Sequence, residues 1–143
     1  MFHQQRVSIL ALSLLAVTTP AVSQDAINLI GTWKGTGYAV HIGATPYRSV
    51  DGAGVKFPEN GIEFTYVIKE QKGNRFAGES SVGAVMETII GAVQTDNRGG
   101  MMLDDDGQYT FVLIDPNAMD LCYNHHSEAG KKLVACFRAT RSR

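Results

Sequence analysis

Two short runs of this chain carry residues that could bind a metal ion: DDDG at 104–107 and NHH at 124–126. A calcium loop places its ligands at alternate positions and adds a later glutamate, and three successive aspartates lack that spacing. Adjacent strand residues face opposite ways, so His125 and His126 do not readily share one metal. We therefore interpret the first run as a hairpin turn and the second as a solvated turn, and we expect no metal site.

Recognised catalytic motifs are absent from the sequence, which contains no nucleophile elbow, phosphate loop or zinc signature. A cysteine nucleophile beside a histidine base would need a free and sheltered thiol. A catalytic carboxylate pair stays open, since nothing selects among Asp104, Asp105, Asp106 and Glu63. We expect a protein that is not an enzyme and that carries no cofactor.

Aromatic and polar residues that face inward are the candidates for a ligand site. Strand alternation places Tyr66 and Tyr123 inside. If residues 106 and 107 form a two-residue turn, Asp104 pairs with Tyr109 on the same inner face. Buried tyrosines need hydrogen-bond partners, which either a ligand in a tyrosine-lined cavity or neighbouring backbone groups can supply. The candidate ligand-binding residues are Tyr47, Arg48, Tyr66, Asp104, Tyr109, Phe111, Tyr123 and Phe137.

The longest irregular segment runs from 41 to 61 and contributes Tyr47 and Arg48. Segments longer than ~12–15 residues without regular structure are usually lids, binding loops or disordered. Together with Lys56 and Phe57, these side chains suit an amphipathic or anionic ligand. An ordinary surface loop is the alternative.

Strands must position these residues, because alternation of apolar and polar residues recurs along the chain and no helical period extends over ten residues. Short turns separate successive strands, which favours an up-and-down meander. Eight antiparallel strands can close without exposed edges, so we predict an all-β, eight-stranded antiparallel up-and-down β-barrel, with a sandwich as the alternative. The expected strands are 29–40, 62–69, 75–82, 86–94, 101–104, 108–114, 119–125 and 132–141.

The turn after the second expected strand decides which residues face inward. In the run KGN at 72–74, a three-residue turn keeps Phe76 on the apolar face, whereas a two-residue turn would put it outside. We therefore predict a turn of three residues, with Gly73 or Asn74 at positive φ.

The two cysteines, Cys122 and Cys136, lie 14 positions apart in the last two expected strands. A hairpin centred on Ala129 places them opposite each other on the outer face, within disulfide reach. Closing such a loop contributes ~3 kcal/mol in the chain-entropy description. We predict a Cys122–Cys136 disulfide, two unpaired thiols on the outer face being the alternative.

The first 23 residues resemble a Sec-type signal peptide, with Arg6, an apolar run from 7 to 17, and small residues Ala21 and Ser23 before the cleavage point. The apolar run is too short to span a bilayer of ~30 Å. We predict cleavage after Ser23, a single barrel domain at 24–143, and a periplasmic or secreted location, an uncleaved anchor helix being the alternative. The net charge of −1 and the lack of a basic stripe argue against nucleic acid, which leaves a small molecule or a protein as the expected partner.

The run GTW at 31–33, the eight expected strands and a basic residue on the last strand together resemble the calycin superfamily, which includes lipocalins and avidins. In lipocalins, the Gly-x-Trp of the first strand lies at the closed end of the barrel beneath an arginine from the last strand. The resemblance implies these structural roles for Gly31, Trp33 and Arg141, with cation–π packing worth ~0.5–2 kcal/mol. It also implies that the first connection, 41–61, folds over the open mouth of the barrel.

Two departures limit what the resemblance implies. The Thr-Asp-Tyr motif of lipocalins is matched only in part by TDN at 95–97, and Trp33 is the only tryptophan, so the biotin pocket of avidins has no counterpart. The chain is also similar to uncharacterised exported proteins of Gram-negative bacteria and to periplasmic barrel-type inhibitors of lysozymes or proteases. We expect an exported barrel that holds a small, partly hydrophobic ligand in an interior cavity of ~300 Å³ or more, with 41–61 as its lid. The alternative is a periplasmic interaction module or enzyme inhibitor that acts through exposed loops.

Overall fold

The computed structural model describes residues 26–44, 54–126 and 130–142. The expected signal peptide, its cleavage point after Ser23, and two candidate ligand residues, Tyr47 and Arg48, lie outside the described residues. The strands of the described part are β1 (Gly31–Ile42), β2 (Val55–Lys56), β3 (Ile62–Lys72), β4 (Arg75–Val82), β5 (Val85–Val93), β6 (Gly99–Leu103), β7 (Gly107–Asp115), β8 (Ala118–His126) and β9 (Lys132–Arg141).

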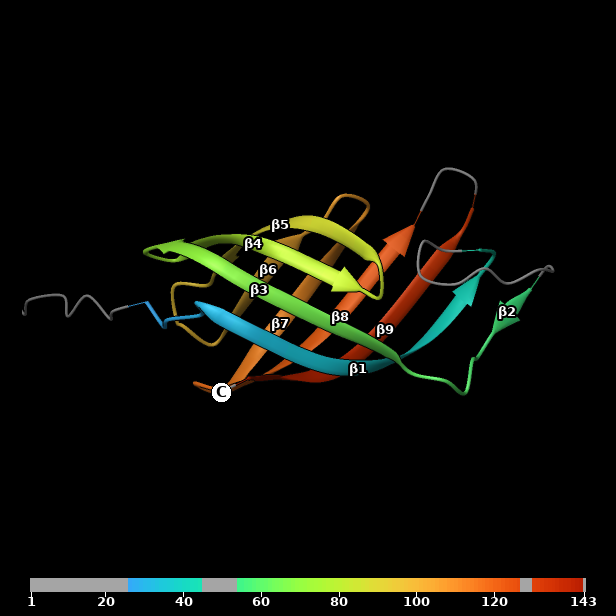
Figure 1. The fold of residues 1–143 in the computed structure, drawn as a ribbon, viewed down its shortest axis with the longest axis horizontal. Coiled ribbons are helices and arrows are strands. Elements are labelled where there is room, and N and C mark those ends of the chain that lie inside the picture. The colour runs from blue at the N-terminus through green and yellow to red at the C-terminus, as the bar shows by residue number, and fades with distance from the viewer. Residues whose placement is uncertain (1–25, 45–53, 127–129, 143) are drawn as a thin grey trace, which may run out of the picture.

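Eight of these strands close into an antiparallel barrel. Strand β1 pairs with β3, each strand from β3 to β8 pairs with the next, and β9 pairs back with β1. In Figure 1, β1 and β3 cross in front of β7, β8 and β9, so they belong to opposite walls. The predicted all-β, eight-stranded antiparallel barrel is therefore confirmed, and the sandwich alternative is wrong.

The two-residue strand β2 was not expected. It lies inside the 41–61 segment and pairs with the end of β1, where Lys56 stands opposite His41. Within the ranges that the structure describes, no helix is long and apolar enough to cross a membrane.

The glycines of β1 make room for an aromatic ring. Burial alternates along the strand, so Gly35 and Gly37 face the interior with Trp33. A Cβ atom on Gly35 would lie 2.8 Å from the ring of Phe137 on β9, and one on Gly37 would lie 2.7 Å from it. Carbon atoms do not pack that closely, so glycine at these positions lets the Phe137 ring occupy the interior.

The β3–β4 turn has two residues, Gly73 and Asn74, rather than the predicted three. Gly73 supplies the positive φ, at +60°. Phe76 still faces inward, because a bulge at Lys69 on β3 inserts the extra residue that the turn was expected to contain. The alternation argument was right about Phe76 and wrong about where the extra residue lies.

The β6–β7 turn is displaced by one residue from the prediction. Asp105 and Asp106 form it, and a backbone hydrogen bond closes it. Tyr109 consequently pairs with Met102 instead of Asp104. The displacement shifts the pairing by two positions, so Asp104 and Tyr109 keep the same face and their side chains still meet.

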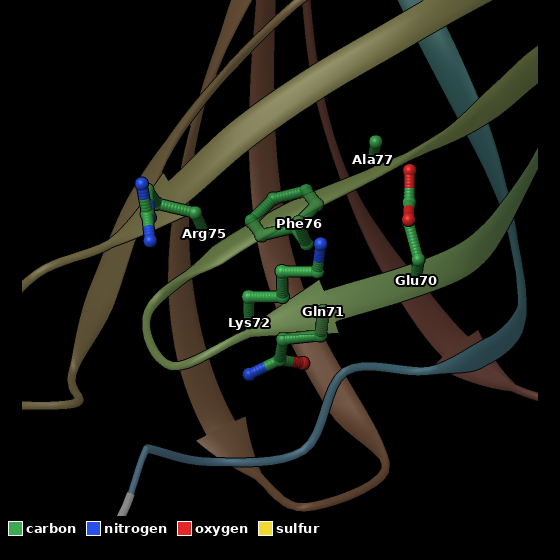
Figure 2. A pocket seen from close by; sticks show the side chains of 6 residues that line it. All are labelled: Glu70, Gln71, Lys72, Arg75, Phe76 and Ala77. Carbon is green, nitrogen blue, oxygen red and sulfur yellow. The ribbon is translucent and has the colours of Figure 1, made fainter.

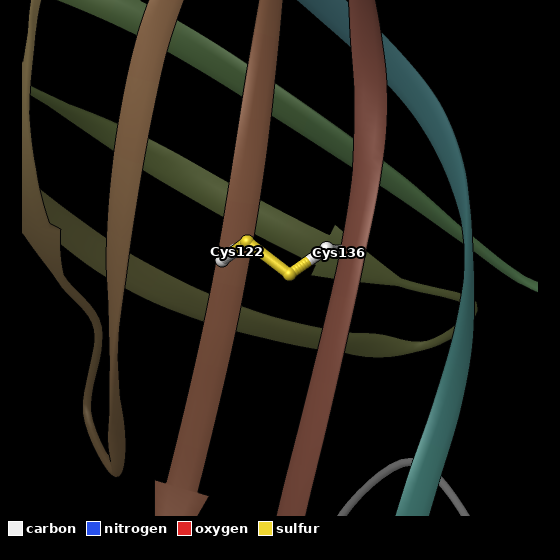
Figure 3. Close-up of a disulfide and its surroundings, with 2 residues drawn as sticks. All are labelled: Cys122 and Cys136. Carbon is white, nitrogen blue, oxygen red and sulfur yellow. A yellow bond between two sulfur atoms is a disulfide. The ribbon is translucent and has the colours of Figure 1, made fainter.

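Cys122 and Cys136 form a disulfide between β8 and β9 (Figure 3). They are direct cross-strand partners, as the hairpin centred on Ala129 predicts, and both belong to the exposed face of their strands. The disulfide is confirmed and the alternative of two unpaired thiols is wrong.

Aromatic rings fill the centre of the barrel. Tyr66, Tyr109 and Tyr123 have 0% exposed surface, and ring centroids lie 5.5 Å apart for Tyr66 and Tyr109 and 4.5 Å apart for Tyr109 and Tyr123. Phe64 and Phe137 stack at 4.8 Å in the same core. Because no space the size of a water molecule borders the three tyrosines, the expected ligand cavity does not form between them.

Candidate functional site

The two ends of the barrel carry different side chains. We call the mouth the end where β1, β4, β6 and β8 finish, toward the right of Figure 1, and the plug end the opposite end. The segment 41–61 leaves β1 at the mouth, whereas residues 26–30 precede β1 at the plug end.

Trp33 and Arg141 lie together at the plug end. The guanidinium carbon of Arg141 is 4.5 Å from the centroid of the Trp33 ring, and the indole N–H donates to the Leu29 carbonyl at 2.9 Å. The Gln71 side chain accepts a hydrogen bond from the Leu29 N–H at 2.8 Å. Gly31 starts β1 at φ +137°, where other residues are strained. These contacts hold the segment before β1 across this end of the barrel.

An open hollow of about 220 Å³ lies over the β3–β4 hairpin at the plug end (Figure 2). Its lining residues are Glu70, Gln71, Lys72, Arg75, Phe76 and Ala77. Charges of both signs surround a shallow opening, and none of the predicted ligand residues lines it. The hollow therefore does not replace the expected ligand cavity.

Three carboxylates meet at the mouth. Glu87 comes from β5, Asp104 and Asp106 come from the β6–β7 connection, and one oxygen of each lies within 4.8 Å of the other two. Glu87 and Asp104 are half-buried, and the Asp106 side chain is 31% exposed. Two unit charges ~4 Å apart repel by ~1 kcal/mol in water and by ~4 kcal/mol at the effective dielectric constant near a protein surface. The mouth thus concentrates negative charge at a cost in stability.

Hydrogen bonds hold the two aspartates in place. The Tyr109 hydroxyl donates to Asp104 Oδ2 at 3.0 Å, and the Tyr123 hydroxyl donates to Asp106 Oδ1 at 3.0 Å. His125, which is buried, donates from Nδ1 to the Asp106 backbone carbonyl at 2.8 Å, and the same nitrogen lies 3.2 Å from Asp106 Oδ1. The carboxylates are therefore oriented by side chains of β7 and β8.

Two buried polar atoms in this half of the barrel, the Tyr66 hydroxyl and His41 Nε2, have no hydrogen-bond partner. Tyr66 lies in one cross-strand row with Glu87, through β4. Burial raises the pKa of Tyr66 well above its ordinary value; the Tyr109 hydroxyl lowers this pKa, and the charge of Asp104 raises it further. The Tyr66 ring lies edge-on to the Tyr109 ring, with centroids 5.5 Å apart, and Tyr109 donates to Asp104, so Tyr66 borders the carboxylates through Tyr109.

The structure brings half of the predicted ligand residues together. Phe111 and Phe137 instead pack against other phenylalanines of the core, and Tyr47 and Arg48 lie outside the described residues. The predicted residues that meet are Tyr66, Asp104, Tyr109 and Tyr123. We call the mouth cluster the set Tyr66, Glu87, Asp104, Asp106, Tyr109, Tyr123 and His125.

The predicted ligand set left out three members of the mouth cluster, Glu87, Asp106 and His125, of which Asp106 was named only as a candidate for a carboxylate pair. Glu87 lies on the same face of β5 as the buried Ile89. A charged residue on an apolar face was therefore a sign in the sequence that Glu87 faces inward. His125 has the same parity as the inward Tyr123 on β8. Both signals were present in the alternation, and the interpretation of 124–126 as a solvated turn was wrong for His125.

Comparison with known proteins gives one distant structural match. No protein-family model and no curated protein matches this chain. Among solved structures, the S-type phycobiliprotein lyase CPES from Guillardia theta matches with a TM-score of 0.38 and 10% sequence identity, over 80% of this chain and 89% of that chain. A similarity at this TM-score and identity carries no argument about the mouth cluster or about function.

Proposed function

We propose that the protein is a small binding protein whose ligand lies at the mouth of the barrel. The ligand is small and partly hydrophobic. Its polar end meets the mouth cluster, and its apolar part lies under the 41–61 segment, where Tyr47 and Arg48 cover it. The mouth takes the place of the interior cavity expected from sequence, because tyrosine and phenylalanine rings occupy the centre.

The mouth cluster carries this proposal. Polar groups without partners in a packed interior lower the stability of a fold, as do like charges placed close together. Proteins keep such groups where binding or catalysis requires them. The Tyr66 hydroxyl is a buried group without a partner, and the three carboxylates are like charges placed close together at the same end of the barrel.

Export and calycin-type architecture belong to the same proposal. We propose that a signal peptide is cleaved after Ser23 and that the barrel at 24–143 works in the periplasm or outside the cell, without enzymatic activity. The Cys122–Cys136 disulfide supports export, because such bonds persist in oxidising compartments. The position of Arg141 over Trp33 supports the calycin resemblance.

Native mass spectrometry of the mature protein, purified from the periplasm with and without reductant, tests the proposal. We expect a bound species of roughly a few hundred daltons, a drug-sized ligand, and a gain of two hydrogens on reduction. Asp106→Asn should lose the bound species, whereas the matched variant Asp105→Asn in the same turn should keep it. An empty wild-type protein, or equal loss in both variants, contradicts a ligand at the mouth.

A second candidate function is an interaction module that docks a partner protein on the outer wall of β5, β6 and β7. Ile90 and Leu103 are direct cross-strand partners there, so the exposed apolar surface continues from β5 to β6. Contiguous apolar patches of this kind mark interaction sites. The exposed residues are Met86, Ile90, Met101, Leu103, Val112 and Ile114.

Capture from periplasmic extract tests this second candidate. A specific partner should be lost with Leu103→Lys and retained with Thr36→Lys, which adds the same charge on the outer face of β1. Recovery of the same proteins by both variants contradicts docking on this wall.

A further inference from the structure

We infer that the mouth of the barrel binds a divalent cation of the calcium class through Glu87, Asp104 and Asp106. The carboxylate oxygens lie within 4.8 Å of one another. Calcium binds oxygen at ~2.4 Å, so two of its ligands can be up to ~4.8 Å apart, and the separations at the mouth do not exceed that span. Carboxylate oxygens are hard ligands, which favour calcium and magnesium over softer metals. Small adjustments of the three side chains would place all of these oxygens at bonding distance from one calcium ion.

The Tyr66 hydroxyl is an independent observation that points to a ligand at this position. It is fully buried, has no hydrogen-bond partner, shares a cross-strand row with Glu87, and packs edge-on against Tyr109, whose hydroxyl donates to Asp104. Calcium takes six to eight oxygen ligands, so three carboxylates leave positions for water molecules. Tyr66 has no exposed surface, so a water bound to the ion reaches its hydroxyl once the ion shifts the neighbouring side chains, and it then pairs with the group that this chain leaves unpaired.

The surroundings of the carboxylates resemble the outer shell of a metal site. Tyr109 donates to Asp104 and Tyr123 donates to Asp106, so one oxygen of each aspartate is fixed by a neutral donor. Such hydrogen bonds orient metal-binding carboxylates. Asp104 also accepts the Gly107 N–H at 2.6 Å, which ties its orientation to the turn itself.

The third ligand comes from outside the turn, which explains why the spacing of DDDG did not indicate the site. A local calcium loop supplies its ligands at alternate positions of one segment. Here two ligands flank Asp105 in the β6–β7 turn, and the third comes from β5, the strand that pairs with β6.

The site is tested with calcium alone, so the result does not depend on the organic ligand proposed above. Calorimetric titration of the mature wild-type protein should give a dissociation constant of roughly 10⁻⁴ M, as for extracellular modules. Terbium bound at the same place should luminesce when the tyrosines are excited, and calcium should displace it. Glu87→Gln and Asp106→Asn should each weaken calcium binding at least about tenfold, the usual loss for a metal-site contact.

Asp105→Asn is the matched control, since it removes the same charge from the same turn and should change calcium affinity less than about twofold, a diffuse electrostatic effect. Asp104 is left intact because its carboxylate also closes the turn. Circular dichroism and thermal melting verify that each variant is folded. If Glu87→Gln does not fold, the calcium affinity of Asp106→Asn is compared with that of Asp105→Asn instead.

The inference is overturned if the wild-type protein binds no calcium at calcium concentrations about ten times the expected dissociation constant. It is also overturned if Asp105→Asn weakens calcium binding as much as Glu87→Gln does. An organic ligand seen by native mass spectrometry in the same preparation would then leave the proposed function standing. Calcium binding without an organic ligand would support the cation site and contradict the proposed ligand.

Discussion

The plug end and the mouth of this barrel bury polar groups in opposite ways. At the plug end, Arg141 lies on the Trp33 ring and donates to a backbone carbonyl, and Gln71 pairs with the segment before β1; of these groups only Arg141 Nε lacks a partner. At the mouth, three carboxylates face one another and the Tyr66 hydroxyl is unpaired. The chain satisfies most polar groups at the first end by itself. At the second end, a buried hydroxyl stays unpaired beside like charges, as the proposed ligand site would require.

The largest expected effect is at the plug end, where Trp33→Ala should lower the free energy of unfolding by ~3–5 kcal/mol, since a fully buried indole leaves a large cavity. Urea unfolding measures the change. Tyr38→Ala on the outer face of the same strand is the control and should stay within ~0.5 kcal/mol, because Tyr38 is 64% exposed. A similar loss in both variants would mean that the plug end does not specially stabilise the fold.

Removal of the disulfide should cause the next largest loss in the free energy of unfolding. We expect this loss to be independent of the plug end and of the mouth. Replacing Cys122 and Cys136 together by serine opens a closed loop and should lower the free energy of unfolding by ~3 kcal/mol. Reduction of the wild-type protein should give the same shift in the urea midpoint. If the double variant is as stable as the wild type, the pairing of β8 with β9 holds without the bridge.

A pair of variants at the mouth should change stability in opposite directions. Tyr66→Phe removes a buried hydroxyl without a partner and should raise the free energy of unfolding by ~1 kcal/mol, whereas Tyr109→Phe removes a donor to Asp104 and should lower it by ~1 kcal/mol. Urea unfolding in the presence of a chelator measures both. Destabilisation by both variants would show that Tyr66 is satisfied in solution, and the contrast between the ends would weaken.

The smallest effect concerns Asp120 and Arg138, an exposed pair on the outer wall. Arg138 donates two hydrogen bonds to Asp120, at 2.7 Å and 3.0 Å, and the first cause of the lowered pKa of Asp120 is this hydrogen bonding. A carboxylate with a lowered folded pKa stabilises the fold above its unfolded pKa of ~3.9 and loses that contribution as the pH falls through the folded value. At this pair, hydrogen bonds and the positive charge of Arg138 stabilise the ionised carboxylate of Asp120.

Urea unfolding of wild type and Asp120→Asn across this acid range checks the sign. The two proteins should differ slightly at neutral pH and converge as the pH falls below the folded pKa of Asp120. Glu63→Gln, on the exposed face of β3, is the control for general charge effects. A difference that grows toward acid pH would contradict a lowered pKa.

Much of the wall of the barrel could be predicted from alternation alone. The strand expected at 132–141 forms as Lys132–Arg141, and the register of the last hairpin follows from which residues of it are apolar. The bulge at Lys69 could not be placed in this way, because alternation shows that an extra residue is needed without showing where the strand takes it up. The same limit displaced the turn at Asp105 and Asp106 by one residue.

Alternation along the chain was enough to predict which side chains face inward and that Cys122 pairs with Cys136, because both depend on a period of two residues. The number of strands and the short turns between them predicted the closure of the barrel. The filled centre could be seen only in three dimensions, since the Phe137 ring lies over Gly35 and Gly37 of another strand and the tyrosines pack against one another. The meeting of Glu87 with Asp104 and Asp106 also depends on the folded arrangement of the strands. Alternation says on which side of a wall a residue lies, whereas the distance between strands and the volume of the rings decide what it touches and how much space remains.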